Sequence, residues 1–174
     1  MPAVPSVPTF GPSIIPASVL NQLADALRFA QAPPKVKATQ SVSQNLTTGV
    51  ATSINFDAAA IDTYVMWDAG LPSRLTALYT GHYLAGGGVS FASNSTSYRI
   101  ARWAINGTVV IDGNVLVQPS SAGVSTRVAA RTTIVYLVEG DYVELQAQHA
   151  IGSTLATSVI LGDPSSASAT FIGQ

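Results

Sequence analysis

The chain has 174 residues, of which only 10% are charged, with a net charge of -1 and no cysteine. The absence of cysteine excludes disulfides, thiolate metal sites and cysteine nucleophiles. The scattered Lys and Arg residues form no basic stripe of the kind that binds nucleic acid. Because a charge-poor surface disfavours a free monomer, the composition predicts an oligomer whose subunits cover part of that surface.

The first 17 residues are predicted to form an extended, proline-rich arm. We expect neither export by a signal peptide nor membrane insertion. No charged and then apolar leader opens the chain, and no stretch approaches the length of a membrane span. Prolines recur at positions 2, 5, 8, 12 and 16 and favour extended backbone. Val4, Phe10 and Ile14 lie between them. A disordered tail is normally more polar, so we expect a partner to receive these side chains.

Residues 18–34 predict a short helix followed by a linker. Ser18 is the expected N-cap, and a Pro-Pro pair ends the helical pattern. Apolar residues at helical spacing form one face, here named the leucine stripe: Leu20, Leu23, Leu27 and Ala30. A helix this short is marginal alone in water. The stripe must therefore pack on the chain's own β-domain, on a symmetry mate or on a host assembly.

Residues 35–174 switch to an alternation of period two, which predicts strands. The expected strands are 36–42, 53–56, 63–68, 74–78, 81–91, 98–105, 108–111, 115–117, 131–138, 142–149, 157–161 and 169–172. Asn106-Gly107 and Asp112-Gly113 between apolar segments are strong hairpin signals. Many short strands without intervening helices predict an all-β domain, an antiparallel sandwich or jelly roll.

The residues that could carry chemistry have simpler explanations. His82 and His149 are the two histidines and sit in no metal-ligand spacing, so both are interpreted as ordinary surface or groove residues. Asp57, Asp62 and Asp68 bracket the expected strand 63–68 but lack the alternating spacing of a calcium loop.

Other motifs also fall short of an enzyme. No G-x-S-x-G elbow occurs, and Gly86-Gly87-Gly88 lacks the lysine and helix of a phosphate cradle. The triple glycine is better explained by a flexible or a closely approached strand segment. We expect no catalytic residue, no cofactor and no metal, although two carboxylates for glycoside cleavage could still meet in space.

Four motifs in order resemble the jelly roll of tumour necrosis factor and of the globular heads of complement. They are "YTGHYLAGGGVSF" from 79, "RWAINGTVV" from 102, "TTIVYLVEGDYVELQAQH" from 132 and "ATFIGQ" from 169. The resemblance implies two five-stranded sheets in each subunit and a tight homotrimer.

The segment "LNQLADALRFAQAPP" from 20 resembles the attachment segment of tailed-bacteriophage minor structural proteins. Together the two resemblances imply a non-enzymatic protein of the virion surface, assembled in the host cytoplasm and bound to phage capsid or tail proteins. The expected anchoring residues are Val4, Phe10, Ile14, Leu20, Leu23 and Leu27. The first hypothesis is a capsid decoration or head fibre. The alternative is a tail-attached, receptor-binding adhesin that recognises host-surface glycans.

Overall fold

The structure, a computed structural model, describes residues 15–109, 112–119, 123–160 and 162–174. Three of the expected anchoring residues, Val4, Phe10 and Ile14, lie outside this range. The expected extended arm over residues 1–17 falls almost wholly outside it as well.

The helix, α1, spans Ala17–Gln31. It begins one residue before Ser18, and no side chain caps its first turn, so the expectation that Ser18 is the N-cap was wrong. Pro16 holds the cap position in extended backbone, and its carbonyl oxygen accepts hydrogen bonds from the amides of Val19 and Leu20. The helix ends before Pro33, because the proline ring disfavours helical backbone at the residue that precedes it. No helix among the described residues has the length and apolar character needed to span a membrane.

The rest of the described chain is built of short and long strands. Their bounds are β1 Lys35–Thr39, β2 Asn45–Leu46, β3 Thr52–Ser53, β4 Ala58–Asp62, β5 Arg74–Thr76, β6 Gly81–Phe91, β7 Arg99–Ile105, β8 Thr108–Val109, β9 Val115–Val117, β10 Thr126–Leu137, β11 Tyr142–His149, β12 Leu155–Ala156 and β13 Ser166–Gly173.

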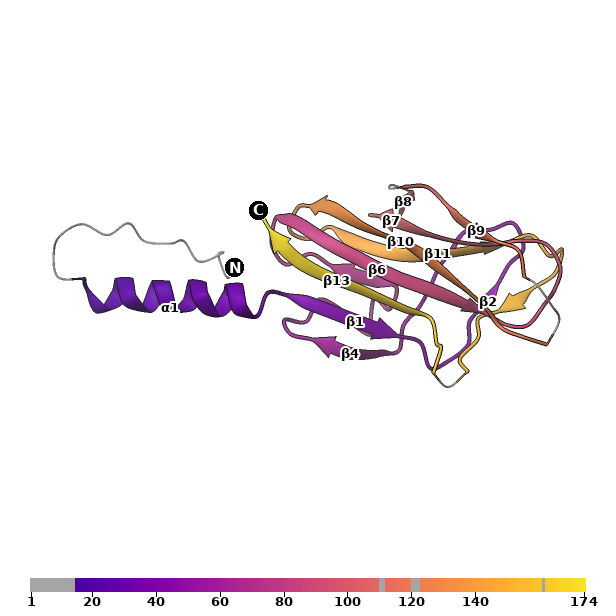
Figure 1. Cartoon of the computed structure of the whole chain (residues 1–174), viewed down its shortest axis with the longest axis horizontal. Helices are drawn as coiled ribbons and strands as arrows, with labels where there is room; N and C mark the ends of the chain where they lie inside the picture. Colours follow the sequence, from indigo (N-terminus) through magenta and orange to yellow (C-terminus); the bar gives the residue numbers. More distant parts are fainter. Residues whose placement is uncertain (1–14, 110–111, 120–122, 161) are drawn as a thin grey trace.

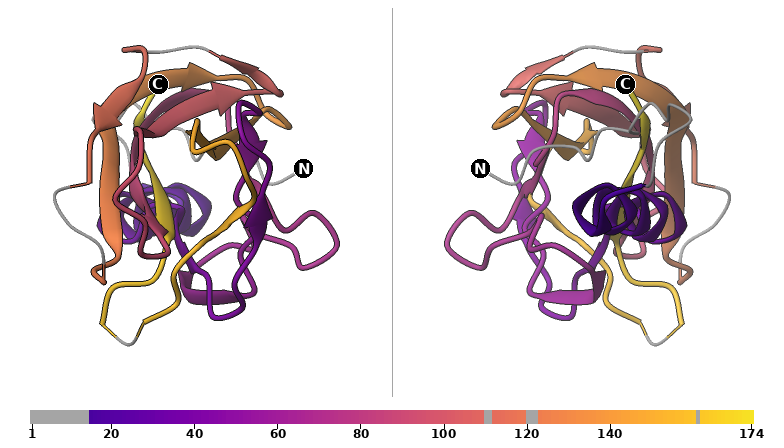
Figure 2. Two further views of the ribbon diagram at one scale, coloured as in Figure 1. Left: turned by 90° about the vertical axis from the view of Figure 1, so that its right-hand side faces the viewer. Right: turned by 90° about the vertical axis from the view of Figure 1, so that its left-hand side faces the viewer.

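Two large antiparallel sheets face each other across one core, as the views along the long axis show (Figure 2). Among the described residues, β2 and β12 form a further sheet of two strands. The first has five strands in the order β10-β6-β13-β1-β4. In the second, β11 and β7 are the long central pair. Over the described residues this sheet has six strands where five were expected, because both of its edges are interrupted: β3 and β5 share one side of β11, and β8 and β9 share one side of β7.

The two expected hairpin signals turn out differently. Asn106 and Gly107 have φ angles of 48° and 78° and connect β7 to β8, which confirms the first hairpin. Asp112 and Gly113 also have positive φ angles, of 56° and 68°. They do not reverse the chain, however, because β8 and β9 both continue along β7. This second signal marks an interruption within one returning strand.

The expected strand 63–68 was wrong. The chain bends there instead, with Val65 at a φ angle of 60°. The Asp62 carboxylate accepts hydrogen bonds from the backbone amides of Met66 and Trp67 at 2.9 and 3.0 Å. These bonds satisfy amides that a sheet ladder would otherwise use, and they direct the Met66 side chain into the core, where it is buried.

Trp103 and Tyr83 are large residues at the centre of the core, and both are almost completely buried. The Trp103 indole donates to the carbonyl oxygen of Arg131 at 2.9 Å, and its ring edge lies over Gly87. A Cβ atom on Gly87 would come within 2.6 Å of the Ser166 carbonyl oxygen. The triple glycine is therefore a closely approached strand, as expected.

Candidate functional site

The helix leaves the sandwich along its long axis (Figure 1). Its leucine stripe is exposed. No residue of α1 is buried; Leu20 and Leu27 are 50% and 54% exposed, and Leu23 is partly exposed. Three of the expected anchoring residues thus lie on one uncovered face. The chain's own head does not pack against that face.

One aromatic residue, Phe29, joins the helix to the head. Its ring meets those of Tyr79 and Phe171 edge-on, with centroid distances of 5.2 and 5.7 Å. The sequence analysis missed this contact because Phe29 does not belong to the leucine stripe. An aromatic residue four positions before the Pro-Pro pair was the available signal.

A second uncovered apolar area, here named the sheet face, lies on the outer side of β6 and β10 and consists of His82, Leu84, Ile134 and Tyr136. Tyr136 pairs with His82 across the two strands, and Ile134 pairs with Leu84. Leu84 is 40% exposed, and Ile134 and Tyr136 are each 57% exposed. The rings of His82 and Tyr136 are in edge contact at 5.3 Å. His82 is therefore a surface residue, as expected.

A cavity of about 490 Å³ connects the leucine stripe with the strands beside the sheet face. Phe29, Ala30 and Pro33 form its helix side, and β13 from Thr170 to Gly173 forms the other side. Thr170 pairs with Leu84 of the sheet face. Ala30, the last residue of the leucine stripe, therefore lines the same cavity as a direct neighbour of the sheet face.

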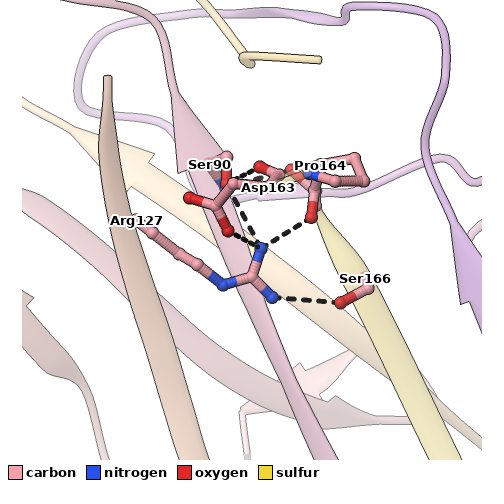
Figure 3. A network of polar contacts seen from close by, with 6 residues as sticks. Ser90, Arg127, Asp163, Pro164 and Ser166 are labelled. Atoms are coloured by element: carbon pink, nitrogen blue, oxygen red, sulfur yellow. Dashed lines mark hydrogen bonds and ion pairs between the residues drawn. The ribbon is translucent and has the colours of Figure 1, made fainter. Parts of the chain in front are cut away.

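A polar cleft of about 280 Å³ lies farther along the same sheet, between Lys37, Arg127 and Asp163. Figure 3 shows how the Arg127 guanidinium is bound. It meets the Asp163 carboxylate at 3.0 Å and donates to the carbonyl oxygen of Pro164 at 2.6 Å and to the hydroxyl of Ser166 at 3.0 Å. Because these partners occupy the guanidinium, its evident role is to hold the loop before β13 against β10.

His149 was interpreted as a surface or groove residue, and this was wrong. Its ring is fully buried, with Nε2 3.0 Å from the carbonyl oxygen of Leu46. Its cross-strand neighbour, Arg99, is equally buried and donates to the backbone carbonyls of residues 94, 96 and 98. Burial lowers the pKa of the Arg99 guanidinium. The position of His149 at the end of a strand suggested that its side chain is exposed. Its burial depends on the segment around Leu46, which is distant in sequence and lies against the ring.

Asp57 and Glu144 accept hydrogen bonds from other groups of the head. Burial raises the pKa of the Asp57 carboxyl, but hydrogen bonds from the hydroxyl and amide of Ser41 and from the amide of Val42 outweigh it, so the pKa lies below its usual value. Glu144 accepts from the hydroxyls of Ser53 and Ser73 at 3.1 and 2.6 Å. Among the described residues, no three His, Asp or Glu side chains come together as a metal site.

The chain matches no protein-family model and no curated protein sequence. Solved structures with a similar fold include crystal structures of murine APRIL at pH 8.5, 8.0 and 5.0, with TM-scores of 0.56, 0.52 and 0.53. Each is 13% identical in sequence, and the matches cover 79–80% of this chain and 98% of the APRIL chain. At this identity the likeness concerns the fold. The described head is an antiparallel jelly roll of the tumour-necrosis-factor type, as the sequence motifs indicated.

Proposed function

We propose that this chain is a non-enzymatic display protein of a tailed-phage virion: a homotrimeric jelly-roll head attached to the particle by the segment that precedes it. The observation that carries the proposal is the position of the leucine stripe. It lies on a helix that extends beyond the head, and the head leaves it uncovered. A 15-residue helix with an apolar face needs a partner to be stable in water.

The sheet face supports the trimer. Apolar side chains of this size in adjacent positions on two strands are typical of an interaction surface. Only 10% of the chain is charged, so the surface offers little repulsion between identical copies. The tumour-necrosis-factor-type jelly roll, together with the trimer that the sequence resemblance implies, points to three subunits.

The N-terminal segment supports the attachment. Its resemblance to phage attachment segments favours capsid or tail proteins as the partner and the virion surface as the location. The described polar groups do not favour catalysis, because Asp57, Asp62 and Glu144 each bind backbone amides or serine hydroxyls within the head. Capsid decoration is preferred over a tail adhesin, since the short helix is the only stalk-like element among the described residues.

The proposal is tested by comparing the full chain with a chain that lacks residues 1–34. Both should sediment as trimers, and only the full chain should be found on purified particles. A copy number that matches the capsid lattice supports decoration, whereas one that matches the tail supports the adhesin. A monomeric head contradicts the trimer, and absence of the full chain from particles contradicts the attachment.

A further inference from the structure

We propose that the α1 helices of three copies pack together through their leucine stripes as a parallel three-helix coiled coil, coaxial with the head. This inference rests on the proposed homotrimer and deepens it by naming the partner of the stripe. Contact with the particle would then fall to the part of the chain before α1 and to the outer sides of the helices.

The spacing of the stripe is that of a coiled coil. Leu20, Leu23, Leu27 and Ala30 are separated by three, four and three residues. This alternation is the a–d–a–d pattern of two heptads, in which each apolar side chain packs into a facing helix. A helix packed on a globular domain usually has a wider apolar face, whereas a stripe limited to the a and d positions is the narrower seam of a coiled coil.

The residues that flank the stripe favour identical, parallel partners. In a parallel coiled coil, the e and g positions of neighbouring helices lie side by side, so like charges there would repel. In α1 these positions hold Val19, Ala24, Ala26 and Gln31, all of them uncharged. The charged residues, Asp25 and Arg28, lie outside the stripe and pair with each other at 3.2 Å. Three equal copies can therefore approach without an electrostatic penalty.

The attachment of the helix to the head orients the stripe. Phe29 lies about 120–180° around the helix from the three leucines, because successive residues are about 100° apart. Its contacts with Tyr79 and Phe171 therefore hold another side of α1 against the head and leave the leucines free. Ala30, the last stripe residue, lines the cavity beside Thr170 and Ile172.

A trimer axis that passes beside this cavity would cover both the leucine stripe and the sheet face. Because α1 runs along the long axis of the sandwich (Figures 1 and 2), three copies around such an axis would bring three helices together beyond the heads. The second and third copies of this chain are therefore the occupants that fit the stripe.

Site-directed crosslinking of the full chain tests this arrangement. The chain has no cysteine, so one engineered thiol reports one position. Ala30→Cys and Leu20→Cys place the thiol at the two ends of the stripe, and Gln22→Cys, on the outer side of α1, is the control. A short bis-maleimide should join two of the three chains in each trimer for both stripe variants. The control should stay uncoupled, because its thiols lie too far apart.

Sedimentation of the same samples separates the possible outcomes. A trimer that couples at Ala30→Cys and Leu20→Cys supports the coiled coil. A trimer in which neither variant couples overturns it and leaves the trimeric head standing. Coupling at Ala30→Cys without coupling at Leu20→Cys would mean that the helices diverge, which also overturns it. A monomer would overturn both the coiled coil and the homotrimer on which it rests.

Discussion

Replacing two residues of the sheet face with charges should dissociate the trimer. The double variant Leu84→Glu with Ile134→Glu changes side chains that pair across β6 and β10 and point away from the core. They are 40% and 57% exposed in the single chain. The head should therefore fold as before, and only subunit contacts should be lost.

The magnitude follows from this exposure. Fully burying a leucine or isoleucine contributes about 1.5–3 kcal/mol, so covering the exposed half of each contributes about 1 kcal/mol. Two residues in three subunits then contribute about 6 kcal/mol to the trimer, or about four orders of magnitude in the association constant. The concentration of half-dissociation varies with the inverse square root of a trimer's association constant, so it should rise roughly hundredfold. Unpaired carboxylates in an apolar contact increase the loss further.

Analytical ultracentrifugation over a range of concentrations measures this shift, with circular dichroism to check the fold. The matched control is Leu71→Glu, in the loop between β4 and β5, where the leucine is 50% exposed. It should leave the trimer unchanged. A double variant that remains as trimeric as the wild type would show that the sheet face is not the subunit interface.

Four further outcomes are expected. Tyr83→Phe should lower the free energy of unfolding by about 1–3 kcal/mol in chemical denaturation, because the buried hydroxyl bonds the amide and carbonyl of one neighbouring residue; Tyr136→Phe, at an exposed ring, should not. Asp57→Asn should destabilise the head at neutral pH. The difference in unfolding free energy between the variant and the wild type should disappear as the pH falls through the lowered pKa of Asp57, since such a carboxylate stabilises the fold only while it is ionised. A difference in unfolding free energy that persists in acid would contradict this cause. A strong chelator should leave the thermal midpoint unchanged, because the described residues form no metal-ligand group, and a drop of several degrees would reveal a structural ion. Leu23→Ala with Leu27→Ala should weaken the packing of the three helices that brings the attachment segments together, and so reduce the number of copies per particle, counted by quantitative mass spectrometry; unchanged occupancy would show that attachment does not depend on the leucine stripe.

The sequence determined those elements whose signals are local. Alternation of apolar and polar residues places β6 and β11 at their observed bounds, because successive side chains of a strand point to opposite faces of the sheet. Asn106-Gly107 specifies its hairpin because few residue pairs adopt two consecutive positive φ angles. The Pro-Pro pair determines where α1 ends, because helical backbone is disfavoured at the residue that precedes a proline.

Only the tertiary structure decided features that depend on distant partners. Residues 63–68 have the composition of a strand, but the Asp62 carboxylate binds their amides and the chain bends. His149 ends a strand and is nevertheless buried, since its environment comes from residues about a hundred positions away. Phe29 stands outside the leucine stripe, and its partners Tyr79 and Phe171 come from opposite halves of the chain. A periodic pattern reveals that an apolar face exists, because periodicity is a property of one segment. What covers that face is a property of the whole fold, and here the head covers Phe29 and leaves the leucines exposed.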